Sequence, residues 1–137
     1  MFRGLATVSF YAEDHAGAKD WYTTLFGGEP PYFDMPGYFE FRVGDQQDEL
    51  GVIDANYAPP GALADRAGAI VFWHVDDLDD TLSQLLAMGA TEYQPITERG
   101  QGFVTASVVD PFGNILGIMT NPHYLEMSSE PHTTRPQ

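Results

Sequence analysis

Residues 104–120, VTASVVDPFGNILGIMT, predict two apolar strands joined by a tight turn. Asp110 suits the first turn position, because its carboxylate can accept a hydrogen bond from the backbone two residues further on. Pro111 presets the backbone for the second position, and Gly113 tolerates the left-handed conformation that leads into the next strand. β-Branched and apolar residues flank the turn on both sides, so this stretch predicts a β-hairpin at the end of a sheet.

Strands and helices alternate in the rest of the chain in an order that occurs twice. The spacing of apolar residues predicts helices over 14–26 and 78–88, capped by Asp14 and by Asp76 or Asp77 and ended by glycine. Residues 98–102, Glu-Arg-Gly-Gln-Gly, are expected to form a flexible loop. The predicted strands are 5–12, 30–33, 38–43, 49–54, 69–75, 91–94, 103–109 and 115–120.

The repeat predicts an α+β protein with two βαβββ modules, because Asp14 to Gly27 and Asp76 to Gly89 span equal intervals. The first module covers residues 1–56 and the second residues 69–121. Residues 57–68 contain Pro and Gly without periodicity, and they are expected to be a linker. Residues 122–137 are expected to be a C-terminal tail that is partly disordered.

Composition narrows the possible partners. The 137 residues include 20 acidic and 6 basic side chains, which gives a formal net charge of −14. This charge repels phosphate backbones and anionic membrane surfaces, so neither nucleic acid nor membrane is an expected partner, whereas a cationic small molecule would be attracted. The chain has no cysteine and no membrane-spanning run, so a soluble cytoplasmic protein is expected.

Several local motifs together resemble the glyoxalase/bleomycin resistance protein/dioxygenase group, also called the vicinal oxygen chelate superfamily. They are the strand-to-helix sequence FWHVDDL at 72–78, the Gly89–Ala90 pair and the DPFGN turn at 110–114, within the duplicated βαβββ order. The resemblance covers roughly residues 5–120. It implies paired modules whose sheets form a U-shaped concave surface around a pocket, often completed by a homodimer.

Enzymes of that family bind a divalent metal through the first and last strands of each module. The resemblance places the ligand positions at Thr7, at Glu49 or Gly51, at Ile70 and at Gly117. A divalent ion normally needs at least three imidazole or carboxylate ligands from the protein, and three of these positions lack such a donor. The expectation is therefore no metal and no cofactor, and catalysis is left open.

A pocket that has lost its metal would be lined by the alternate side chains of its strands, which form an apolar surface with a few polar groups. His74 is the most versatile of them, since imidazole exchanges protons near neutral pH, although a structural histidine is the plainer interpretation. The predicted groove residues are Thr7, Ser9, Tyr11, Tyr38, Glu49, Ile70, Phe72, His74 and Met119.

Three functions remain open from the sequence. The first is a metal-free protein that binds a small cationic or aromatic molecule in the groove. The second is a metal-dependent lyase, isomerase or dioxygenase with a rebuilt metal site, for which Glu49 and His74 are the only pair available. The third is a domain that binds another protein through its tail.

Overall fold

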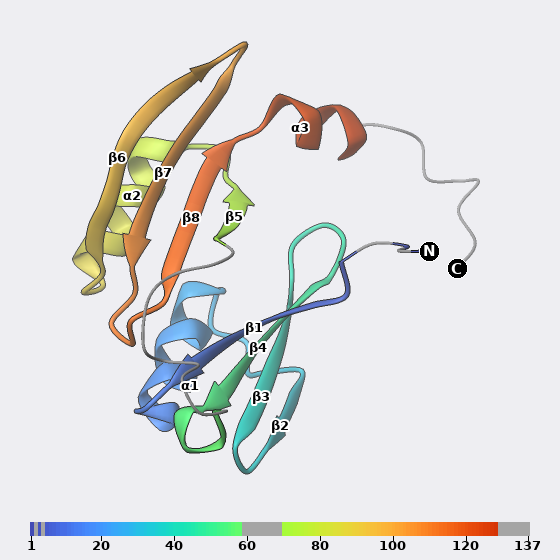
Figure 1. Cartoon of the computed structure of the whole chain (residues 1–137), viewed down its shortest axis with the longest axis vertical. Coiled ribbons are helices and arrows are strands. Elements are labelled where there is room, and N and C mark those ends of the chain that lie inside the picture. Colours follow the sequence, from blue (N-terminus) through green and yellow to red (C-terminus); the bar gives the residue numbers. More distant parts are fainter. Residues whose placement is uncertain (2, 4, 59–69, 129–137) are drawn as a thin grey trace. The chain divides into compact units, whose positions relative to one another are not determined.

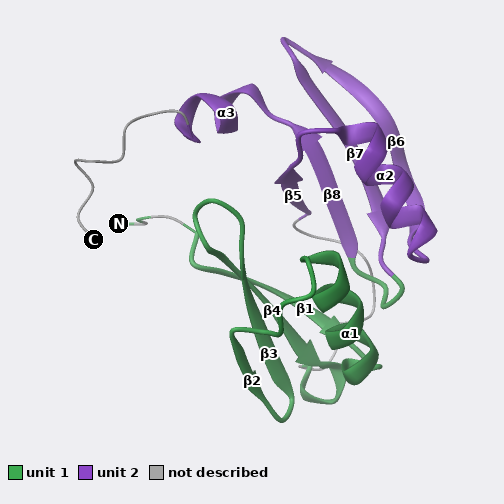
Figure 2. Cartoon of the chain, turned by 180° about the vertical axis from the view of Figure 1, so that it is seen from behind, with its two compact units in different colours: residues 1–69, 111–114 green, residues 70–110, 115–137 purple. Residues whose placement is uncertain are grey.

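The computed structural model describes residues 1, 3, 5–58 and 70–128, and the chain divides into two units (Figure 2). The first unit comprises residues 1–69 and 111–114, and the second comprises residues 70–110 and 115–137. Each unit contains one four-stranded mixed sheet with a helix against one face (Figure 1). This confirms the predicted α+β class and the βαβββ order of each module.

The sheet of the first unit has the strand order β1-β4-β3-β2. β1 runs parallel to β4, and the other neighbours are antiparallel. The elements of this unit are β1 (Thr7–Ala12), α1 (His15–Leu25), β2 (Phe33–Met35), β3 (Tyr38–Val43), β4 (Asp48–Asp54) and the short 3₁₀ helix η1 (Ala55–Tyr57).

Local chemistry explains where α1 begins and which face of this sheet it covers. The Asp14 carboxylate accepts a hydrogen bond of 3.0 Å from the Gly17 backbone N–H and caps the helix, as predicted. Tyr22 of α1 and Phe39 of β3 are both fully buried, whereas Thr7 on β1 is exposed. One face of the sheet is therefore core, and the other face is open to side chains that need not pack.

The second unit repeats this arrangement with the strand order β5-β8-β7-β6. β5 runs parallel to β8, and the other neighbours are antiparallel. Asp77 caps its long helix by accepting a 3.0 Å hydrogen bond from the Asp80 backbone N–H. The elements are β5 (Val71–His74), α2 (Leu78–Ala87), β6 (Thr91–Gly100), β7 (Phe103–Val109), β8 (Ile115–Thr120) and α3 (Pro122–Ser128).

The hairpin predicted from residues 104–120 is confirmed as β7 and β8, and Gly113 has the expected positive φ of 92°. The turn itself belongs to the first unit. The Asn114 side-chain amide donates a 2.9 Å hydrogen bond to the Tyr11 carbonyl, and the Phe112 ring meets the Trp21 ring edge-on. The turn is thus fixed by specific contacts of its side chains as well as by its backbone geometry.

In the second half, one prediction was wrong and one helix was not predicted. β6 continues to Gly100, so residues 98–100 are strand and not loop, because Glu98 and Gly100 pair with Val104 and Phe103 of β7. The tail begins with the helix α3, which was not predicted from the sequence. Asn121 precedes this helix and caps it, and Pro122 takes its first position, where the missing N–H costs no hydrogen bond.

Some predictions concern residues that lie outside the described ranges, namely residues 59–68 of the linker and residues 129–137 of the tail. Across the described ranges, none of the helices has the length and apolar character that crossing a bilayer would require.

Candidate functional site

The open face of the first sheet brings together the predicted groove residues of this unit. Strand register places Thr7 beside Glu49 and Ser9 beside Gly51, on adjacent strands β1 and β4. The Thr7 hydroxyl donates a 2.8 Å hydrogen bond to Glu49 Oε1. Tyr11 shares this alternation but is half-buried. The face therefore carries a carboxylate, Glu49 on the inner strand β4, that is held in a defined orientation.

An arginine and a tyrosine complete this arrangement, and neither was predicted as a site residue. The Arg42 guanidinium lies 3.2 Å from Glu49 Oε2, on the oxygen that Thr7 does not use. Its central carbon also lies 3.7 Å from the centroid of the Tyr32 ring, which is a cation–π distance. Alternation along β3 places Arg42 and Glu40 on the same face as Tyr38, and this pattern could have identified Arg42 and Glu40 from the sequence.

Tyr38 forms the second polar contact on this face. Its hydroxyl donates a 2.6 Å hydrogen bond to Glu40 Oε1. Partial burial, the hydrogen bond to Glu40 and the negative charges of Glu40 and Glu49 together raise the pKa of Tyr38 to about 12, and burial contributes most. The phenol consequently stays protonated near neutral pH and serves as a hydrogen-bond donor.

We expect the tyrosinate absorbance of Tyr38 to appear about 2 pH units later than that of a free phenol, since its pKa is about 12 against the ordinary 10.0. The protonated phenol stabilises the fold below pH 10, and this contribution is lost as the pH rises through about 12. Spectrophotometric titration of the protein and of Tyr38→Phe measures the difference. Tyr93→Phe, which removes an exposed tyrosine, is the control and should leave the late increment in place. If the absorbance increase at high pH persists unchanged in Tyr38→Phe, the raised pKa does not belong to Tyr38.

The open face of the second sheet is mostly apolar. Register places Phe72 beside Gly117 and His74 beside Met119, on strands β5 and β8. Ile70, which directly precedes β5, and Phe72 on β5 are 38% and 40% exposed. The predicted apolar residues of this unit therefore lie where a small molecule could contact them.

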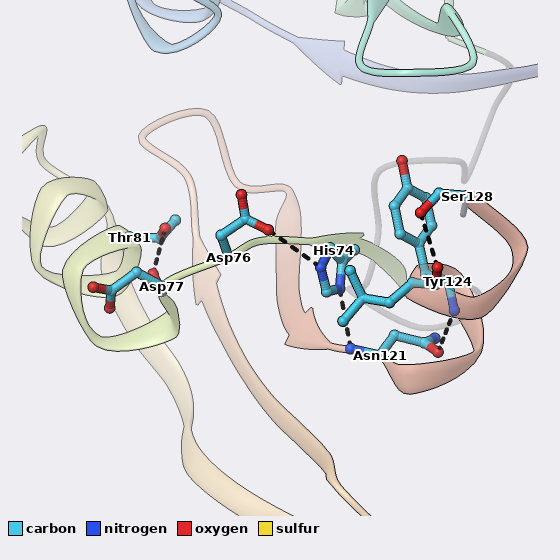
Figure 3. Close-up of polar contacts among 8 residues, drawn as sticks. His74, Asp76, Asp77, Thr81, Asn121, Tyr124 and Ser128 are labelled. Atoms are coloured by element: carbon cyan, nitrogen blue, oxygen red, sulfur yellow. Dashed lines mark hydrogen bonds and ion pairs between the residues drawn. The ribbon is translucent and has the colours of Figure 1, made fainter.

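His74 has a different environment, because it joins β5 to α3 (Figure 3). Its Nδ1 accepts a 3.1 Å hydrogen bond from the backbone N–H of Asn121, so the neutral ring carries its proton on Nε2. Nε2 lies 3.6 Å from Asp76 Oδ1, beyond hydrogen-bonding distance. The ring stacks on Tyr124 of α3 at 4.8 Å between centroids. These contacts give His74 a role in holding α3, and its side chain is only 7% exposed.

The four metal-ligand positions implied by the resemblance do not fit a divalent ion. Ile70 and Gly117 offer no donor atom, and a Cβ at Gly117 would lie 2.5 Å from Phe72 Cδ1, so the ring occupies the space of any ligand there. A Cβ at Gly51 would likewise collide with the Tyr38 hydroxyl. Of the residues described, no three His, Cys, Asp or Glu side chains are grouped so that they could hold a metal ion.

Comparison with known proteins places these features in a family. The model of the Glyoxalase/Bleomycin resistance protein/Dioxygenase superfamily matches residues 4–118. No curated protein matches the sequence significantly.

Many solved structures share the fold. A bleomycin resistance determinant encoded on transposon Tn5 is 21% identical with a TM-score of 0.63, and the match covers 87% of this chain and 98% of that one. Protein ATC0852 from Agrobacterium tumefaciens is 19% identical with a TM-score of 0.71, and the match covers 87% of this chain and 98% of that one. The fosfomycin resistance protein FosX from Mesorhizobium loti is 15% identical with a TM-score of 0.66, and the match covers 93% of this chain and 99% of that one. At these identities the similarity establishes the fold alone.

Proposed function

Because the chain belongs to the glyoxalase/bleomycin resistance protein/dioxygenase superfamily, we propose that it binds a small aromatic cation on the open face of its first sheet and needs no metal to do so. The observation that carries this proposal is the polar and aromatic array of that face. Glu49 is oriented by Thr7, Glu40 is held by Tyr38, and the Tyr32 ring contacts the guanidinium of Arg42, which also pairs with Glu49.

The chemistry of the array matches such a ligand. A carboxylate fixed by hydrogen bonds binds a cation with little reorganisation, and an exposed ring adds stacking and cation–π energy. Phe33 and Met35 of the edge strand β2 are 47% and 49% exposed and add apolar surface on the same face. The formal net charge of −14 would raise the association rate of a cation through long-range attraction.

The proposal also includes contacts on the second sheet, a class of ligand, a compartment and an oligomeric state. On the second sheet, considered by itself, Ile70, Phe72 and Met119 would provide apolar contacts to a ligand, and Met119 adapts its shape readily. The name of the Tn5 bleomycin resistance determinant supports an antibiotic as one class of ligand. We also propose a cytoplasmic homodimer, which the absence of cysteine and the family membership favour.

Isothermal titration calorimetry with bleomycin and with a panel of small aromatic amidines tests the binding function. We expect Glu49→Gln and Glu40→Gln to weaken binding about tenfold each, since a charge-assisted hydrogen bond is lost in each variant. Glu29→Gln makes the same charge change at an exposed residue outside the strands of this unit and should leave the affinity unchanged.

Two results would overturn the proposal. One is the absence of binding heat with every compound in the panel. The other is a near-stoichiometric metal ion in protein purified without added metal, measured by elemental analysis, which would favour a metal-dependent enzyme instead.

A further inference from the structure

Arg42 is placed as a bound ligand would be. Its guanidinium contacts an aromatic ring, Tyr32, and a carboxylate, Glu49, at 3.7 Å and 3.2 Å. These two groups come from the segment before β2 and from β4, and Arg42 itself lies on β3 between those strands. The ring and the carboxylate are thus brought together around one planar cation.

The binding groups favour a planar cation over a compact one. A guanidinium or an amidinium can stack its flat face on a ring while its N–H groups point at a carboxylate. Thr7 holds Glu49 through Oε1 at 2.8 Å, so Oε2 stays oriented toward the cation even if Arg42 leaves. The carboxylate of the site therefore keeps its orientation without Arg42.

The contacts of Arg42 are also weak enough to exchange. The side chains of Arg42 and Glu49 are 36% and 27% exposed, and Tyr32 is 66% exposed. Ion pairs in such positions are screened by water and salt and contribute little to stability. A soluble cation can reach the ring and the carboxylate, and the arginine side chain is long enough to move into solvent.

We infer that Tyr32 and Glu49 form a subsite for a planar organic cation, an amidinium or a guanidinium, and that Arg42 occupies this subsite in the free protein. Arg42 then determines specificity, because only a ligand that binds better than this intramolecular cation displaces it. The inference rests on the proposed function in so far as it names the cationic group that the first sheet would recognise.

Benzamidine titrations by calorimetry or by NMR chemical shifts test the inference. Arg42→Ala empties the subsite, and we expect benzamidine to bind about tenfold more tightly than to the wild type, because one exposed ion pair and one cation–π contact no longer compete. Lys19→Ala is the matched control. It removes one positive charge and another ion pair of this unit, Lys19–Asp34 at 2.9 Å, which joins α1 to the edge strand β2.

The double variant Arg42→Ala/Glu49→Gln should lose the gain, and Arg42→Gln should retain it. Unchanged thermal midpoints would show that the variants remain folded. An Arg42→Ala gain no larger than that of Lys19→Ala overturns the inference even if the wild type binds aromatic cations, in which case the proposed function stands. A gain that survives in the double variant also overturns it, since Glu49 would then not be the binding group.

Discussion

Replacing Phe39 with alanine is expected to lower the free energy of unfolding by about 3–5 kcal/mol. Phe39 is fully buried on the core face of β3, where its ring packs against His15 at 4.7 Å and Phe41 at 5.6 Å between centroids. The truncation removes these contacts and leaves a cavity. Chemical denaturation followed by circular dichroism measures the loss.

The neighbouring residue provides the control, because it lies on the opposite face of the same strand. Glu40→Ala should cost less than about 1 kcal/mol, since it removes one partly exposed hydrogen bond from Tyr38. Comparable losses in the two variants would contradict the assignment of the open face, and with it the location of the candidate site. The pair therefore tests the register on which the proposed function depends.

Replacing His74 with alanine is expected to release α3 and to lower the free energy of unfolding by about 2 kcal/mol. The variant loses the stacking with Tyr124 and leaves the backbone N–H of Asn121 without its acceptor. Hydrogen exchange of the amides in residues 122–128 reports on the helix directly. These amides should exchange much faster than in the wild type, while those of β7 and β8 remain protected.

Two further variants separate the contributions of His74. His74→Asn keeps a hydrogen-bond acceptor close to the position of Nδ1 and should restore part of the protection of α3. Asp76→Ala should have little effect, because the Asp76 side chain is 99% exposed and lies 3.6 Å from Nε2. Unchanged exchange of α3 in His74→Ala would show that other contacts hold the helix.

Much of the fold could be predicted because it depends on residues close in sequence. The strands over 38–43, 103–109 and 115–120 were predicted with the observed bounds, from alternation and turn residues alone. Asp14 caps its helix as expected, since a cap needs only a side chain and the backbone three residues later. The duplicated order of these elements then gave the fold class and the family resemblance.

The errors arose where pairing between strands overrides local preference. Residues 98–100 contain polar residues and glycine, which favour a loop, but β7 pairs with them and extends β6 through three register shifts.

The helix α3 was missed although Asn121 followed by Pro122 is a recognisable start signal. A short helix of this kind gains its stability from contacts such as the one between His74 and Tyr124, which the local sequence does not reveal.

The sequence by itself determined which side chains of each strand share a face, because that depends only on the two-residue period of the chain. It also determined that three of the four metal positions implied by the family resemblance lack an imidazole or carboxylate donor, because donor atoms are a property of residue type. The tertiary structure alone decided that Arg42 meets Tyr32 and Glu49, and that His74 supports α3. These contacts join residues from different elements, and they depend on which segments become neighbours in the sheet, which the pattern within one segment does not specify.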